Sequence, residues 1–113
     1  MGAMTLNLTT ITVDCRDALE VAGFWSAALD RPLDDGATAD FASVGGAPAM
    51  AFVRVPEGKQ VKNRVHVDLQ APDREKEVKR LLKLGATRVA DIDEDGQQWT
   101  TLADVEGNEF CVA

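Results

Sequence analysis

The feature that most constrains the fold of this chain is an internal repeat. Asp17 and Asp73 are 56 residues apart, and each is placed to cap a run of apolar residues at helical spacing. A segment with the composition of a strand precedes each helix, and further strand-like segments follow it. A half this short has one helix to cover one face of its sheet. The sequence therefore predicts two βαβββ modules, with both helices outside a cupped, mostly antiparallel sheet.

The first module is predicted at about residues 6–57. Residues 6–13 are rich in Thr, Ile and Val and predict its first strand. A helix follows from the Asp17 cap to about Leu29, and two of its apolar side chains are expected in the core, Phe24 and Trp25. A short strand is expected within residues 36–46, and a stronger one at 50–55.

The second module is predicted at about residues 62–113. Residues 64–70 alternate between apolar and polar side chains, which is typical of a strand with one buried face. The helix after Asp73 carries acidic residues in its first turn and ends at Gly85. Three strands complete the module, at residues 87–92, 98–103 and 109–112.

Composition excludes several classes of function. The chain has 19 acidic and 12 basic residues and a net charge of −7, so nucleic acid is not an expected partner. No apolar run has the roughly 20 residues that a membrane helix needs. The two cysteines, Cys15 and Cys111, do not form a disulfide framework and favour a cytoplasmic location. Residues 1–3 look like an expression scar, so we expect one domain at 4–113.

Three segments resemble a known family. They are DCRDALEVAGFWSAAL (residues 14–29), NRVHVDL (63–69) and DVEGNEFCV (104–112). They are similar to the glyoxalase-like domain of the vicinal oxygen chelate superfamily, which includes glyoxalase I, extradiol dioxygenases, and fosfomycin and bleomycin resistance proteins. The resemblance covers nearly the whole chain. It implies the paired βαβββ fold and a homodimer, but one scaffold hosts many chemistries.

The resemblance also locates the positions where metal enzymes of the superfamily place their ligands. These are typically His and Glu, on the first and fourth strands of each half. Matched motif to motif, the positions here are Thr10, Val53, His66 and Cys111. Only His66 is a familiar ligand, and a hard divalent ion prefers imidazole and carboxylate groups. We therefore expect no metal and no cofactor.

An unusual metal site is the alternative. Cys111 and His66 are good zinc ligands, and Asp68 or Glu109 would add an oxygen. Against this, each acid is two residues further along its strand, roughly 6–7 Å away. Cys111 is otherwise a small core side chain or, with His66, a nucleophile.

The predicted function is metal-independent binding of a small molecule, a metabolite or an antibiotic, as in bleomycin resistance proteins. Trp99 either packs on the second helix or forms a wall of the pocket. The predicted ligand-binding residues are Thr10, Val53, His66, Asp68, Trp99 and Cys111. The alternative is an enzyme, either a lyase or isomerase with His66 as acid or base, or a dioxygenase-like enzyme with His66 as metal ligand.

Overall fold

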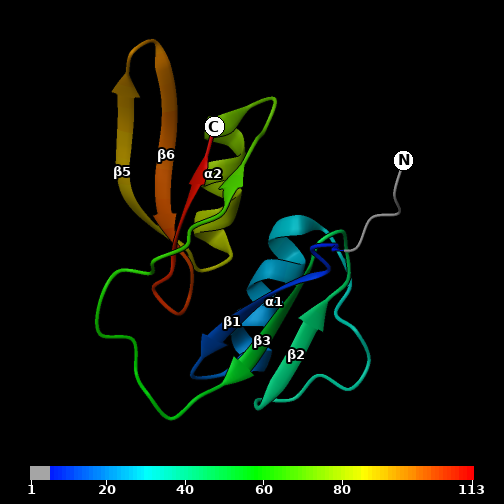
Figure 1. Cartoon of the computed structure of the whole chain (residues 1–113). Helices are drawn as coiled ribbons and strands as arrows, with labels where there is room; N and C mark the ends of the chain where they lie inside the picture. Colours follow the sequence, from blue (N-terminus) through cyan, green and yellow to red (C-terminus); the bar gives the residue numbers. More distant parts are fainter. Residues whose placement is uncertain (1–5) are drawn as a thin grey trace. The chain divides into compact units, whose positions relative to one another are not determined.

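The computed structural model describes residues 6–113, so the predicted expression scar lies outside the described residues. The chain divides into two compact units, Met1–Pro56 and Glu57–Ala113. The described residues form two helices and seven strands in two mixed sheets, which is an α+β fold (Figure 1). Each unit has its own helix and its own sheet, and each is described below by itself.

The N-terminal unit contains β1 (Thr10–Cys15), α1 (Ala18–Leu29), β2 (Phe41–Val44) and β3 (Ala49–Arg54). The strand order is β1-β3-β2 (Figure 1). β1 pairs in parallel with β3, and β2 pairs antiparallel with β3. A parallel pair needs a long crossover connection, and α1 lies within the one that joins β1 to β3.

Local capping explains where α1 begins and ends. The Asp17 side chain accepts a hydrogen bond from the Glu20 backbone N–H at 3.1 Å, as predicted. Asp30 ends the helix in the left-handed conformation, with φ of 54°. The rings of Phe24 and Trp25 pack edge to face at 5.4 Å, and both side chains are buried, which confirms their predicted place in the core.

Two predictions for the N-terminal unit need correction. The first strand begins at Thr10 rather than Leu6, because its partner β3 begins at Ala49, directly opposite Thr10. Leu6 and Leu8 are consequently exposed. In addition, only two strands follow the helix, and the first of the three strand positions of a βαβββ module is reduced to a single bridge between Leu33 and Val44.

The C-terminal unit contains β4 (Asp68–Leu69), α2 (Arg74–Lys83), β5 (Thr87–Glu94), β6 (Gln97–Ala103) and β7 (Glu109–Val112). The strand order is β4-β7-β6-β5. The short β4 pairs in parallel with β7, and the other two pairs are antiparallel. This unit has the complete strand–helix–three-strand order that the sequence predicts.

The ends of α2 follow the sequence signals. The Asp73 side chain accepts a hydrogen bond from the Lys76 N–H at 3.2 Å. Beyond the helix, Gly85 has φ of +117°, and a Cβ there would lie 2.9 Å from Val105 Cγ1, so only glycine fits. The core of this unit is formed by Val78, Leu81, Leu102, Phe110 and Val112.

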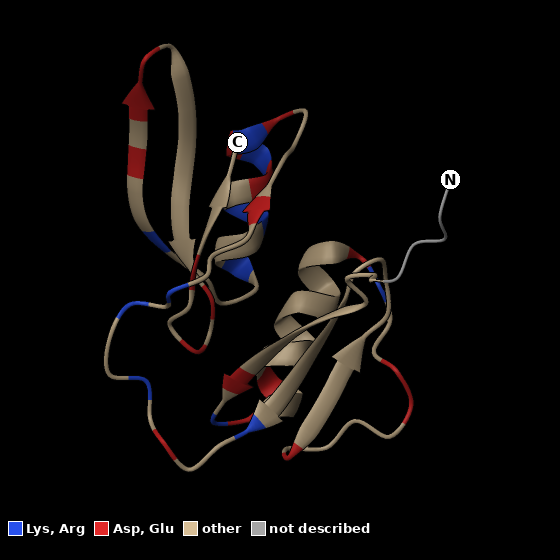
Figure 2. Cartoon of the chain, in the orientation of Figure 1, with Lys and Arg blue, Asp and Glu red and all other residues tan. Residues whose placement is uncertain are grey.

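Charged side chains gather on α2 and β5 and connect these elements (Figure 2). Arg88 on β5 forms an ion pair with Glu75 on α2 at 2.7 Å and another with Asp91 at 2.8 Å. Asp91 also accepts a hydrogen bond from the buried Thr100 hydroxyl at 2.8 Å. That hydrogen bond, with the Arg88 charge, lowers the pKa of Asp91.

The turn between β6 and β7 is built on a buried carboxylate. Asp104 accepts hydrogen bonds from the backbone N–H groups of Glu106 and Asn108, at 2.9 and 3.0 Å. Gly107 supplies the positive φ that the turn requires. The motif DVEGN therefore fixes the geometry of this turn and the start of β7.

The strand predicted at residues 64–70 is mostly absent, because β4 spans only two residues. The reason is that the Asn63 side chain takes the place of backbone hydrogen bonds between a longer β4 and β7. Asn63 Oδ1 accepts from the Glu109 N–H at 2.8 Å, and Asn63 Nδ2 donates to the Glu109 carbonyl at 3.0 Å. Asn63 Nδ2 also donates to the Val65 carbonyl. The amide thus occupies the backbone groups that a longer β4 would pair with, and Val65 is 74% exposed.

Candidate functional site

The site residues of the C-terminal unit share one face of its sheet. Asp68 on β4 and Thr101 on β6 are both directly paired with Cys111 on β7. Paired residues point to the same side of a sheet, and the His66 side chain reaches Asp68 on that side, with Nε2 3.3 Å from Oδ1. The opposite face carries the core side chains Leu102, Phe110 and Val112. Four polar side chains therefore lie on the face away from the core.

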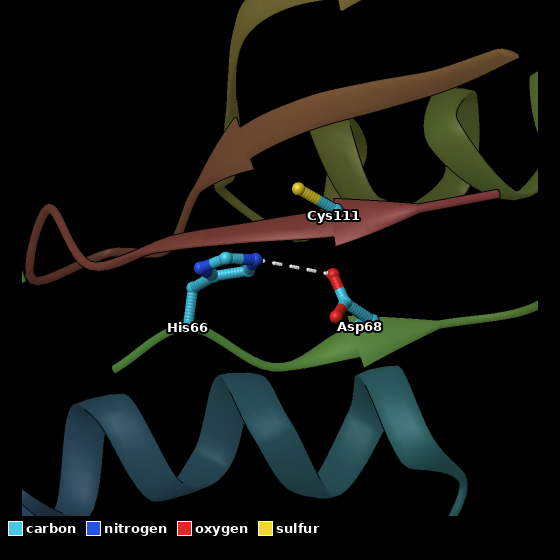
Figure 3. Close-up of side chains that lie close together, drawn as sticks. All are labelled: His66, Asp68 and Cys111. Atoms are coloured by element: carbon cyan, nitrogen blue, oxygen red, sulfur yellow. Dashed lines mark ion pairs between the residues drawn. The ribbon is translucent and has the colours of Figure 1, made fainter. Parts of the chain in front are cut away.

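The three potential ligands converge on one another (Figure 3). His66 Nε2 lies 3.3 Å from Asp68 Oδ1. One donor atom each of His66, Asp68 and Cys111 can be chosen so that all three lie within 4.8 Å of one another. The imidazole side chain is 46% exposed and the carboxylate side chain 74% exposed. The arrangement is an accessible cluster of imidazole, carboxylate and thiol.

The spacing argument against Asp68 as a neighbour of the cluster is wrong. Cα atoms two residues apart on a strand are separated by roughly 6–7 Å. However, both side chains project to the same side, and their ends approach to 3.3 Å. Glu109, the other acid considered, instead lies 3.9 Å from Lys62 Nζ.

Two residues outside the sequence prediction support the cluster. Asn63 fastens the segment before β4 to Glu109, and this places His66 alongside β7. The Thr101 hydroxyl lies 3.4 Å from Cys111 Sγ, within hydrogen-bonding distance. The repeat held a signal for Asn63, because Asn7 lies 56 residues before it.

Trp99 lies on the same face as the cluster by strand alternation, since it is two residues before Thr101 on β6. Its neighbours Thr100 and Leu102 point to the core side instead. Strand alternation favours the predicted pocket wall over packing on the second helix, and the role of Trp99 stays a prediction. The half-buried ring adds an aromatic surface to the face that carries His66 and Cys111.

Thr10 and Val53 belong to the N-terminal sheet and are not neighbours there. β1 and β3 pair Thr10 with Ala49, and Asp14 with Val53, so four residues of strand, roughly 13 Å, separate the two positions. The pair that corresponds to Asp68 and Cys111, by the 56-residue repeat and the strand register, is Thr12 with Ala51.

The metal site that the resemblance implies does not fit these residues. Neither Val53 nor its neighbour on the same face, Ala51, has a donor atom, so the last strand of the N-terminal sheet offers no ligand at either register. Thr10 is a poor ligand for a divalent ion. The set of His and carboxylate ligands that a hard cation prefers is therefore incomplete in this chain.

The family of the chain follows from comparison with known proteins. The profile of the family described as a glyoxalase-like domain matches residues 10–113. The chain therefore belongs to this family, which confirms the predicted place in the vicinal oxygen chelate superfamily. No curated protein matches the chain.

Solved structures support the same fold. A glyoxalase/bleomycin resistance protein/dioxygenase family enzyme from Burkholderia phytofirmans PsJN has a TM-score of 0.78 at 16% identity, over 95% of this chain and 97% of that one. The fosfomycin resistance protein FosX from Listeria monocytogenes, solved with Mn(II) and a dihydroxypropylphosphonic acid, has a TM-score of 0.77 at 10% identity, over 97% and 90%. These TM-scores show a shared fold, and the predicted fold class is confirmed.

A third similar structure is a bleomycin-binding protein from Streptomyces verticillus in complex with copper(II)-bleomycin. Its TM-score is 0.67 at 15% identity, over 98% of both chains. Structures with this fold thus include proteins in complex with small molecules of very different size.

Within residues 6–113, neither helix has the length and apolar character needed to cross a membrane.

Proposed function

We propose that this protein binds a small organic molecule, a metabolite or an antibiotic, without the help of a metal ion. The observation that carries the proposal is the sheet face of the C-terminal unit, where Trp99 lies with His66, Asp68 and Cys111 away from the core. An aromatic surface with a few polar groups is the usual composition of a ligand site. The ligands of structures with this fold support it.

The proposal assigns roles to the individual side chains. Trp99 stacks on an apolar or aromatic part of the ligand, and His66 and Asp68 form hydrogen bonds with its polar groups. Cys111 contributes a small, polarisable surface between them. Thr10 and Val53, on the N-terminal sheet, stay predicted contacts that the family resemblance alone supports. Ligand binding at such a face needs no ion.

Calorimetric and thermal-shift titration of the full chain tests the proposal. The ligands are a set of antibiotics and metabolites that includes bleomycin and fosfomycin, each tested with a chelator and then with Mn²⁺ or Ni²⁺. We expect at least one ligand to raise the melting temperature equally in both conditions. Trp99→Ala should lower the affinity for that ligand, whereas Leu19→Ala, at an exposed position of α1, should leave the affinity unchanged. Binding that disappears with the chelator would contradict metal independence.

A second candidate is an enzyme in which His66 acts as a general acid or base. The contact between His66 Nε2 and Asp68 Oδ1 favours it, because a carboxylate beside an imidazole orients the ring for proton transfer. The reaction class is that of a glyoxalase-like lyase or isomerase. His66→Ala should then abolish turnover while the circular dichroism spectrum is unchanged. Turnover that survives this substitution would exclude the role.

We also propose a cytoplasmic homodimer. The resemblance to the superfamily supports the dimer, and two cysteines that form no disulfide with each other support a reducing compartment. Light scattering after size exclusion tests the dimer, and a mass of one chain would contradict it. Fractionation of the source cells tests the location.

A further inference from the structure

The cluster of His66, Asp68 and Cys111 brings an imidazole, a carboxylate and a thiol together, and a surface that binds an organic molecule does not require all three. We propose that His66, Asp68 and Cys111 bind a thiophilic divalent ion, of which Zn²⁺ is the natural candidate (Figure 3). This inference goes beyond the proposed function, because it assigns the same three side chains a metal ion when no organic ligand is bound. It also differs from the site that the family resemblance implies, since all three ligands come from one half of the chain.

The geometry supports a three-ligand site. Zinc binds sulfur at about 2.3 Å and nitrogen or oxygen at about 2.0–2.2 Å, so tetrahedral ligand atoms lie roughly 3.3–3.7 Å apart. His66 Nε2 and Asp68 Oδ1 already lie 3.3 Å apart, and all three donor atoms fall within 4.8 Å. Closing the remaining gap requires rotation of the two exposed side chains, His66 and Asp68. The strand pairing of Asp68 with Cys111 fixes the backbone positions.

The charges of the cluster fit a divalent ion. A thiolate and a carboxylate with a neutral imidazole carry two negative charges, which one Zn²⁺ neutralises. The Thr101 hydroxyl lies 3.4 Å from Cys111 Sγ and is placed to donate to the thiolate, as supporting residues of metal sites do. Binding transfers the thiol proton to solvent and forms the metal–sulfur bond. Three protein ligands leave a fourth position open to water.

The ligand types set the class of ion. Thiolate and imidazole select zinc and other thiophilic ions, whereas Mn²⁺ and Mg²⁺ prefer oxygen ligands. The metal enzymes of the superfamily use His and carboxylate ligands, whereas this cluster includes the thiolate of Cys111. The cluster should therefore prefer different ions. It also places the ligands in a single sheet, in which β7 supplies the sulfur and the β4 segment supplies the nitrogen and oxygen.

Titration of the full-length, chelator-treated protein with Co²⁺ is the direct test, because Co²⁺ replaces zinc and gives a near-ultraviolet absorption band only when bound to a thiolate. We expect this band in the wild type, together with the visible bands of tetrahedral Co²⁺, and loss of both on addition of Zn²⁺. Cys111→Ser should remove the thiolate band. Cys15→Ser is the matched control and should retain it.

Competition for Zn²⁺ against a chromophoric chelator measures the other two ligands. His66→Ala and Asp68→Asn should each weaken zinc binding by at least about tenfold. Glu109→Gln, which removes a nearby acid from outside the cluster, should not. A wild type without the thiolate band, or a band that persists in Cys111→Ser, would overturn the proposal. The proposed small-molecule binding uses the same side chains, so it is measured separately with the chelator present, and failure of the zinc site would leave it standing.

Discussion

The two halves of the chain share a topology but carry different chemistry. In each, the first strand pairs in parallel with the last one, and an Asp caps the helix that follows the first strand. At matched positions of these sheets, however, the N-terminal half has Thr12 opposite Ala51, and the C-terminal half has Asp68 opposite Cys111. Both pairs are accommodated in a sheet of this topology. The donor groups of the C-terminal half are therefore not explained by folding.

The largest expected effect concerns what the halves have in common, a fully buried aromatic side chain on the last strand. Phe52→Ala and Phe110→Ala should each lower the free energy of unfolding by about 3–5 kcal/mol, because each removes a ring that is at most 1% exposed. Urea denaturation followed by circular dichroism measures both. Phe41→Ala, at a half-exposed position, is the control and should cost under about 1 kcal/mol. Equal losses at Phe41 and Phe110 would contradict the described core.

Most of the fold was predictable because its signals are local. The caps Asp17 and Asp73, the glycine at 85 and the turn at 104–108 each act within a few residues of the chain. The 56-residue repeat then predicted the same order of helix and strands for both halves. Strand ends were less predictable, because they depend on a partner elsewhere in the sequence. β1 begins at Thr10 because Ala49, the first residue of its partner β3, lies opposite Thr10.

The sequence indicated the three residues of the cluster but not their geometry, and it did not indicate Asn63 or Thr101 beside them. The motif NRVHVDL indicated His66 and Asp68, and the last strand indicated Cys111. The alternation also predicted a continuous strand, and it could not reveal that the Asn63 amide takes the place of the ladder. A side chain that mimics a backbone partner leaves no periodic pattern. The convergence of the three donor atoms depends on that local arrangement.

The two halves differ at Asn7 and Asn63, which occupy the same position of the 56-residue repeat. Asn63→Ala should lower the free energy of unfolding by about 1–3 kcal/mol, because it leaves backbone groups of Glu109 without their partner. It should also speed hydrogen exchange of the Glu109 amide. Asn7→Ala, the same change at the exposed repeat position, is the control and should have little effect. A similar response at both positions would mean that Asn63 does not fasten β4 to β7.

A smaller effect should be equal in the two halves. Asp17→Ala and Asp73→Ala each remove an N-cap that accepts a backbone N–H, and each should cost about 1 kcal/mol. Thermal denaturation of both variants measures the costs. Replacement by Asn keeps the acceptor and should restore most of the stability. If Asp73→Ala alone were destabilising, the cap geometry of α1 would not contribute as described.

The smallest expected effect belongs to the C-terminal half and depends on pH. The Thr100 hydroxyl, with Arg88, lowers the pKa of Asp91, so the ionised carboxylate favours the folded state. This contribution is fully present above the pKa of the unfolded chain, roughly 4, and is lost as the pH falls through the lower folded value. The melting temperatures of wild type and Asp91→Asn should therefore differ most at neutral pH and converge in acid.

Asp95→Asn provides the matched control for that pH dependence. It removes the same charge from the tip of the β5–β6 turn, and Asn tolerates the positive φ of 51° found there. Its melting temperature should follow that of the wild type across the pH range. A constant difference between Asp91→Asn and wild type from neutral to acid pH would show that the hydrogen bond from Thr100 matters but the charge does not. The link from β5 to α2 would then depend on Arg88 and Glu75 alone.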